Sequence, residues 1–122
     1  MANKAPGFAA HPEHTITLSA PSDAAVAYGG TAVARSNTAI HLTEDRYPPR
    51  AYLPRADITA ELTKSEKTTY CPFKGDTVYF HVTVDGATLE NAAWSYETPF
   101  DEMAAIAHLV AFDDRFAVSG AR

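Results

Sequence analysis

The side chains best suited to chemistry gather in one stretch of this sequence, residues 68–99. Cys71 is the only cysteine, and it becomes a nucleophile where a neighbouring lysine or histidine favours the thiolate. Lys74 would hold a phosphate or carboxylate group, or act as a desolvated amine. Both have structural alternatives, because a free cysteine is often a small buried residue and a lysine stem often covers an aromatic ring. Gly75 would let another backbone approach Lys74 closely.

Aromatic residues that also carry a polar atom form a second group of candidates. Trp94 and Tyr96 stand two positions apart, and Tyr52 and Tyr70 precede them in the chain. Such rings line ligand sites, where the ring stacks on a flat molecule and the polar atom orients it. The alternative is an aromatic cluster within the core. Asn91 would orient a ligand or cap a turn.

Arginines on a proline-rich segment complete the candidate binding residues. Residues 44–54 read EDRYPPRAYLP, and their three prolines exclude a central strand. The segment is either a stiff surface loop or the rim of a pocket. In the second case Arg46 and Arg50 would clamp an anion.

Metal-ligand spacing is absent from the sequence. The histidines are scattered, at His11, His14, His41, His81 and His108. We therefore expect no metal site, and the sequence leaves any cofactor unknown.

Size and charge indicate one domain that does not bind nucleic acid polymers. A chain of 122 residues has the usual length of a single domain, expected here over residues 14–119 after a flexible N-terminal arm at 1–13. The formal net charge of −5 disfavours nucleic acids and anionic membranes as partners. A single cysteine and the lack of a long apolar run favour a cytoplasmic protein. Exposed strand edges would permit a homodimer as well as a monomer.

Short alternating segments predict a mainly β fold. The clearest element is a hairpin, in which residues 78–84 alternate apolar and polar side chains before Asp85-Gly86, a pair favoured in type I′ turns. A second hairpin is expected around Gly29-Gly30. Turns at Ser36-Asn37 and residues 64–67 would separate the other short strands, expected at 14–20, 39–43, 58–63 and 110–112.

One helix is predicted near the C-terminus. Thr98 offers a capping oxygen, Pro99 suits the first helical position, and Asp101 complements the helix dipole. Apolar residues from Met103 to the end of the helix near Leu109 follow the spacing of a helix face. The expected fold is therefore mainly β, with curved antiparallel sheets of short strands and one C-terminal helix packed on the sheet.

Four motifs in a fixed order carry a family resemblance. They are Pro48-Pro49-x-x-Tyr52-x-Pro54-x-x-Asp57, Thr69-x-Cys71-Pro72-x-Lys74-Gly75, Asn91-x-Ala93-Trp94-x-Tyr96-x-x-Pro99 and Val110-Ala111-Phe112. From about His14 onward, the sequence resembles the bacterial family called domain of unknown function 427, also labelled nucleotidyltransferase-like. One departure is that Asp113-Asp114 stand where the family has an aromatic residue and a proline. The resemblance implies a compact, β-tent-like fold; the zinc site of two cysteine pairs found in many β-tent proteins cannot form with one cysteine.

Three functions fit these residues, and whether the protein is an enzyme stays open. The favoured one is a small-molecule-binding domain, with a pocket between the proline-rich rim, the Cys-Pro-x-Lys-Gly turn and the Trp-x-Tyr strand for an anionic or aromatic ligand. Its predicted site residues are Arg46, Arg50, Tyr52, Cys71, Lys74, Asn91, Trp94 and Tyr96. The first alternative is a nucleotidyltransferase-like enzyme that uses Lys74 on a phosphate and Asp57 as a carboxylate. The second is a non-catalytic structural or protein-interaction module with its aromatic residues in the core.

Overall fold

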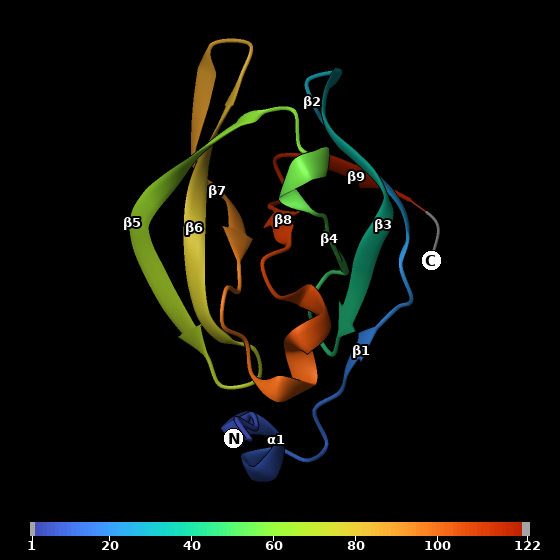
Figure 1. Ribbon diagram of the computed structural model, residues 1–122, viewed down its shortest axis with the longest axis vertical. Helices are drawn as coiled ribbons and strands as arrows, with labels where there is room; N and C mark the ends of the chain where they lie inside the picture. Colours follow the sequence, from blue (N-terminus) through green and yellow to red (C-terminus); the bar gives the residue numbers. More distant parts are fainter. Residues whose placement is uncertain (1, 121–122) are drawn as a thin grey trace.

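Two antiparallel β-sheets make up most of the protein (Figure 1). The computed structural model describes residues 2–120. One sheet has the strand order β1–β3–β2–β9, with β4 also paired to β3, and the other has the order β5–β6–β7–β8. The strands are β1 (Ile16–Leu18), β2 (Ser22–Tyr28), β3 (Thr31–Glu44), β4 (Arg50–Tyr52), β5 (Glu61–Cys71), β6 (Gly75–Val84), β7 (Ala87–Ser95), β8 (Val110–Phe112) and β9 (Ala117–Ser119). The helical segments are α1 (Pro6–Ala10) and the 3₁₀ turns η1 (Arg55–Asp57) and η2 (Asp101–Ile106). The predicted mainly β fold is confirmed.

Both predicted hairpins form, for the local reason that identified them. β6 and β7 are joined at Asp85 and Gly86, whose φ angles of 50° and 79° are the two positive values that a type I′ turn needs. β2 and β3 are joined at Gly29 and Gly30, whose φ angles of 54° and 83° are also positive. Local turn chemistry therefore fixes both connections.

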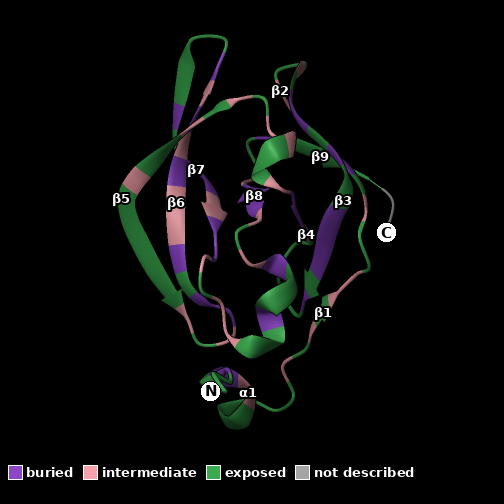
Figure 2. Ribbon diagram, viewed as in Figure 1, coloured by how far each residue is buried: buried purple, intermediate pink, exposed green. Residues whose placement is uncertain are grey.

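The two sheets meet where β4 runs beside β8. Leu53 and Val110 exchange backbone hydrogen bonds of 2.9 and 2.8 Å, which join the sheets at this point. Two clusters of buried residues result. The larger is almost entirely aliphatic and aromatic, and the smaller combines aliphatic residues with Tyr52 and Tyr96. β5 is the edge strand of the second sheet and is exposed along most of its length (Figure 2).

The predicted C-terminal helix is not confirmed. The segment forms only the short 3₁₀ turn η2, which has no side-chain cap and a break in its helical angles at Met103. Met103 and Ile106, three residues apart, are both buried, as the period of a 3₁₀ turn allows. The chain must then reach Val110, the first residue of β8, which pairs with Ser95 of β7, so pairing with the sheet ends the helical path early.

The two predicted turns at Ser36-Asn37 and residues 64–67 are also wrong, because both segments lie inside strands. β3 runs through Ser36, and its pairing with β2 shifts register there rather than ending. β5 runs through residues 64–67 with a bulge opposite β6. The Ser65 hydroxyl accepts a hydrogen bond from the Lys67 N–H at 3.1 Å, so the local bonding typical of turns here produces a bulge.

The N-terminal segment packs against the rest of the protein. The Asn3 N–H donates to the Asp101 carboxylate at 2.7 Å, and the Gly7 N–H donates to the Pro72 carbonyl at 2.9 Å. The ring of Phe8 meets that of Phe73 edge-on, with centroids 5.0 Å apart. Flexibility of residues 1–13 stays a prediction, and residue 1 lies outside the described residues.

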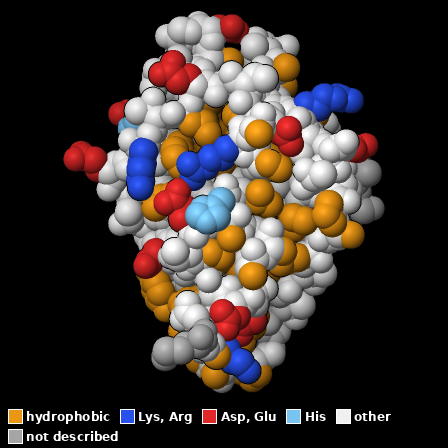
Figure 3. All heavy atoms as spheres, in the orientation of Figure 1, with side chains coloured by type: hydrophobic (Ala, Val, Ile, Leu, Met, Phe, Trp, Pro, Cys, Tyr) orange, Lys and Arg blue, Asp and Glu red, His pale blue; other side chains and the backbone are white. Residues whose placement is uncertain are grey.

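Charged groups of both signs are interspersed with apolar ones on the face seen in Figure 1, as Figure 3 shows. One ion pair joins Arg55 and Glu97 at 2.7 Å. Within residues 2–120, the helices are too short and too polar to cross a membrane.

Candidate functional site

Strand register places polar and aromatic residues on one face of the second sheet. Tyr79 on β6 pairs with Trp94 on β7, and Thr69 on β5 pairs with Thr77 on β6. Alternate residues of a strand share a face, so Thr77 and Tyr79 lie together and Tyr96 follows Trp94. These residues form one wall of a pocket.

The opposite wall comes from the first sheet. Leu42 pairs with Arg50 across β3 and β4, and Ile40 pairs with Tyr52. The same alternation carries Glu44, at the end of β3, onto the face that holds Leu42. Between the walls lies a pocket of about 620 Å³, within the usual range for small-molecule sites.

A buried ion pair occupies one end of this pocket. The Lys74 ammonium donates to Glu44 Oε1 at 2.5 Å, and both side chains are less than 10% exposed. His14 Nε2 lies 2.8 Å from Glu44 Oε2, and Cys71 Sγ lies 4.0 Å from Lys74 Nζ. Burial acts to lower the pKa of Lys74, but the hydrogen bond to Glu44 and the nearby Tyr96 outweigh it and raise the pKa. Lys74 is therefore a charged group with a fixed partner.

Two buried tyrosines lie between the ends of the pocket. Tyr52 is 1% exposed, and its hydroxyl oxygen accepts a hydrogen bond of 3.1 Å from Trp94 Nε1. Burial raises the pKa of Tyr52 far above its usual value. Burial also raises the pKa of Tyr96, although a hydrogen bond with Thr77 acts in the opposite direction. Both phenols therefore stay protonated and can donate hydrogen bonds at neutral pH.

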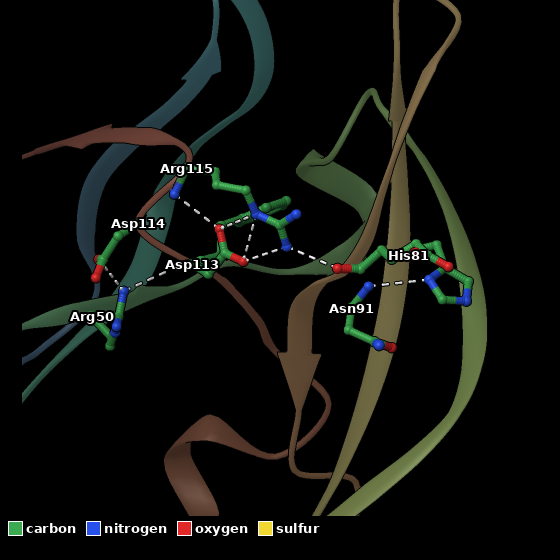
Figure 4. A network of polar contacts seen from close by, with 8 residues as sticks. Arg50, His81, Asn91, Asp113, Asp114 and Arg115 are labelled. Carbon is green, nitrogen blue, oxygen red and sulfur yellow. Dashed lines mark hydrogen bonds and ion pairs between the residues drawn. The ribbon is translucent and has the colours of Figure 1, made fainter.

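Arg50 also lines the pocket, as do Asp113 and Asn91. Its guanidinium carbon lies 5.1 Å from the centre of the Trp94 ring, a cation–π contact. Arg50 Nη1 donates to Asp114 at 2.8 Å, and Figure 4 shows this pair next to the one between Asp113 and Arg115. The Asn91 N–H donates to the ring of His81, which holds the adjoining bulge of β7 in place.

Arg50 and Lys74, the two cations of the pocket lining, differ in how much their ion pairs contribute to stability. Asp114 is 80% exposed, and a surface ion pair of this kind contributes about 0–1 kcal/mol. Removing one partner of a buried pair such as Lys74 and Glu44 costs about 3–5 kcal/mol. Arg50 is therefore the positive charge that a ligand could engage at little cost.

A family model described as a domain of unknown function, DUF427, matches residues 17–120. The chain belongs to this family. The resemblance carried by the four motifs is thus confirmed, and the match includes every residue that lines the pocket except His14. No curated protein matches the chain.

All but one of the predicted site residues of this DUF427 domain line the pocket; these are Arg50, Tyr52, Cys71, Lys74, Asn91, Trp94 and Tyr96. Arg46 instead borders a smaller hollow beside His11 and Phe73. Roles in ligand binding stay predictions for all of them. Within the described part of the chain, His, Cys, Asp and Glu side chains form no group of three or more that could hold a metal.

The structure does not bring Lys74 and Asp57 together. Asp57 borders a different hollow of about 670 Å³, together with Asp23 and Arg35. That hollow is slightly larger, but it lacks the aromatic walls and buried donors of the pocket between the sheets. We therefore regard the smaller pocket as the candidate site.

Two residues of the buried group around Lys74, namely Glu44 and His14, were not identified from the sequence. Glu44 was assigned to the proline-rich loop, although it continues the alternation of Ile40 and Leu42 and so places an acid on an apolar face. That pattern would have identified it. His14 offers no such signal, because only the path of the N-terminal segment brings it to Glu44.

Proposed function

We propose that this DUF427 domain binds a small molecule in the pocket between its two sheets. The observation that carries the proposal is the convergence of conformationally fixed aromatic and polar side chains from both sheets on one pocket. Apolar rings supply contact area and a few placed polar groups supply orientation, which is the usual composition of a ligand site. Neither a reaction nor a cofactor is assigned.

Two of the most exposed large apolar side chains support the same conclusion. Tyr47, in the turn between β3 and β4, is 62% exposed, and Tyr70, on β5, is 59% exposed; both line this pocket. Exposed apolar groups rimmed by polar residues are typical of interaction sites. The ligand would therefore enter past these two rings.

A thermal-shift screen of the full chain tests the proposal. The compounds are nucleotides, sugar phosphates and small carboxylates, each with and without Mg²⁺. A ligand at one hundred times its Kd adds about 2.7 kcal/mol of stability. For a domain of this size that is a rise in Tm of roughly ten degrees. A shift that requires Mg²⁺ and a nucleotide would favour the transferase alternative instead.

Two substitutions on the exposed strand β5 provide a matched comparison. Thr69 lines the pocket, whereas its neighbour Thr68 does not. Thr69→Trp should fill the pocket and abolish the ligand-induced shift, and Thr68→Trp should leave it intact. Equal loss in both variants, or a screen without any shift, would contradict the proposal.

A further inference from the structure

Three side-chain acceptors around the pocket, Glu44, Asp113 and Asn91, already have hydrogen-bond partners within the protein. Glu44 has a partner on each carboxylate oxygen. Asp113 accepts hydrogen bonds from Arg115 on both of its oxygens, at distances of 2.7–3.3 Å. The side-chain oxygen of Asn91 accepts a hydrogen bond of 2.5 Å from Ser65. A ligand that presents hydrogen-bond donors would therefore compete with bonds inside the protein.

Donor groups of the pocket retain free capacity. The Tyr52 oxygen accepts from Trp94, and among residues 2–120 no acceptor lies within reach of the Tyr52 hydroxyl proton. Arg50 makes both of its hydrogen bonds through Nη1, to Asp114 and to the Phe112 carbonyl, which leaves Nε and Nη2 as free donors. The pocket is thus matched to a ligand rich in acceptors.

The charge of the ligand follows from the partner of Arg50. Asp114 already presents a carboxylate to the guanidinium at 2.8 Å, so this group fits the position. Its side chain is 80% exposed, whereas the Arg50 side chain is 23% exposed. A carboxylate held inside the pocket would be better shielded from water than the exposed Asp114 carboxylate, and charge-assisted hydrogen bonds are stronger where water is excluded.

We propose that the ligand is a flat carboxylic acid that presents acceptors rather than donors. Its carboxylate accepts hydrogen bonds from the free Nε and Nη2 of Arg50, and its ring lies in the pocket beside Trp94, with an acceptor toward Tyr52. This inference rests on the proposed function, because it names the ligand class of the same pocket. Asp114 acts as a competing carboxylate, because it already compensates the charge of the same guanidinium through Nη1.

The emission of Trp94, the only tryptophan, reports binding directly. The probes are the three pyridine carboxylic acids, each compared with its neutral methyl ester and its neutral amide. The acids should bind at least tenfold more tightly than the esters, and the esters more tightly than the amides, which add a donor. In Asp114→Asn, affinity for the acids should rise about threefold, with no change for the esters. Arg50→Gln should erase the preference for the acids.

Arg55 and Glu97 provide the matched controls. Arg55 makes the same kind of ion pair at 2.7 Å and lies over the Phe80 ring at 4.7 Å, but it does not line the pocket. Arg55→Gln and Glu97→Gln should leave the affinities unchanged. Because Asp114 is exposed, its variant keeps the test valid even if Arg50→Gln fails to fold.

Two outcomes separate the inference from the function on which it rests. Esters or amides that bind as tightly as the acids, or an unchanged affinity in Asp114→Asn, would overturn the inference and leave a ligand pocket in place. If the pyridine compounds all fail to bind and the thermal-shift screen is also flat, both the inference and the proposed function are wrong.

Discussion

Replacing Lys74 by methionine tests whether the pocket is built around a buried ion pair. The substitution keeps an unbranched side chain, one heavy atom shorter, but leaves the Glu44 carboxylate buried without the lysine ammonium, at a site where both side chains are less than 10% exposed. An orphaned buried charge costs about 3–5 kcal/mol. For a chain of this size, Tm should fall by roughly 10–20 degrees.

The assay is thermal unfolding followed by circular dichroism, with a double-mutant cycle. Adding Glu44→Gln to Lys74→Met removes the orphaned charge, so the double variant should regain most of the lost stability. Lys64→Met is the control, because Lys64 is an exposed residue of β5. A double variant as unstable as Lys74→Met, or a loss no larger than that of the control, would refute the reasoning.

The pH dependence of the stability that the Lys74 charge contributes has a defined sign. The pKa of Lys74 is raised in the folded protein, so the stability gained from its charge is fully present below the ordinary lysine value, about 10.4. It is lost only as the pH rises above that value. The wild type should therefore keep its advantage over Lys74→Met throughout the neutral range. A loss of that advantage between about pH 6 and pH 8 would contradict this assignment.

Two further predictions concern the backbone around the site. Gly75 has a φ of 120°, and a Cβ there would lie 3.3 Å from Pro99 Cα, so Gly75→Ala should lower the free energy of unfolding in urea by about 1–3 kcal/mol. Gly29 has a φ of 54° and open space around it, so Gly29→Ala should lower that free energy by less. The reverse order would be evidence against this account. A Cβ at Gly7 would lie 2.8 Å from the Phe73 ring, so Gly7→Ala should release the N-terminal segment and speed proteolysis within residues 2–13. Ala9→Ser, at an exposed position, is the control, and equal cleavage rates in the two variants would show that this contact does not hold the segment.

Local signals in the sequence predicted those elements that depend on a few neighbouring residues. Asp85-Gly86 defines its hairpin because the turn type needs two positive φ angles, whatever lies elsewhere in the chain. Gly29-Gly30 defines the second hairpin in the same way, with φ angles of 54° and 83°. The same approach failed for residues 98–109, where good capping residues precede a segment that forms only a 3₁₀ turn. Pairing of Val110 with Ser95 decides that path, and it depends on residues far apart in the chain.

The sequence alone determined the family, the mainly β fold and seven of the residues that line the pocket, because these follow from ordered motifs and from strand alternation. Only the tertiary structure decided the partners of those residues. Lys74, in the turn before β6, meets Glu44 of β3, and His14 reaches Glu44 through the N-terminal segment. Arg50 lies on Trp94 because β4 runs beside β8. The physical reason is that short-range patterns fix which face a side chain occupies, whereas the packing of one sheet against the other fixes what it meets there.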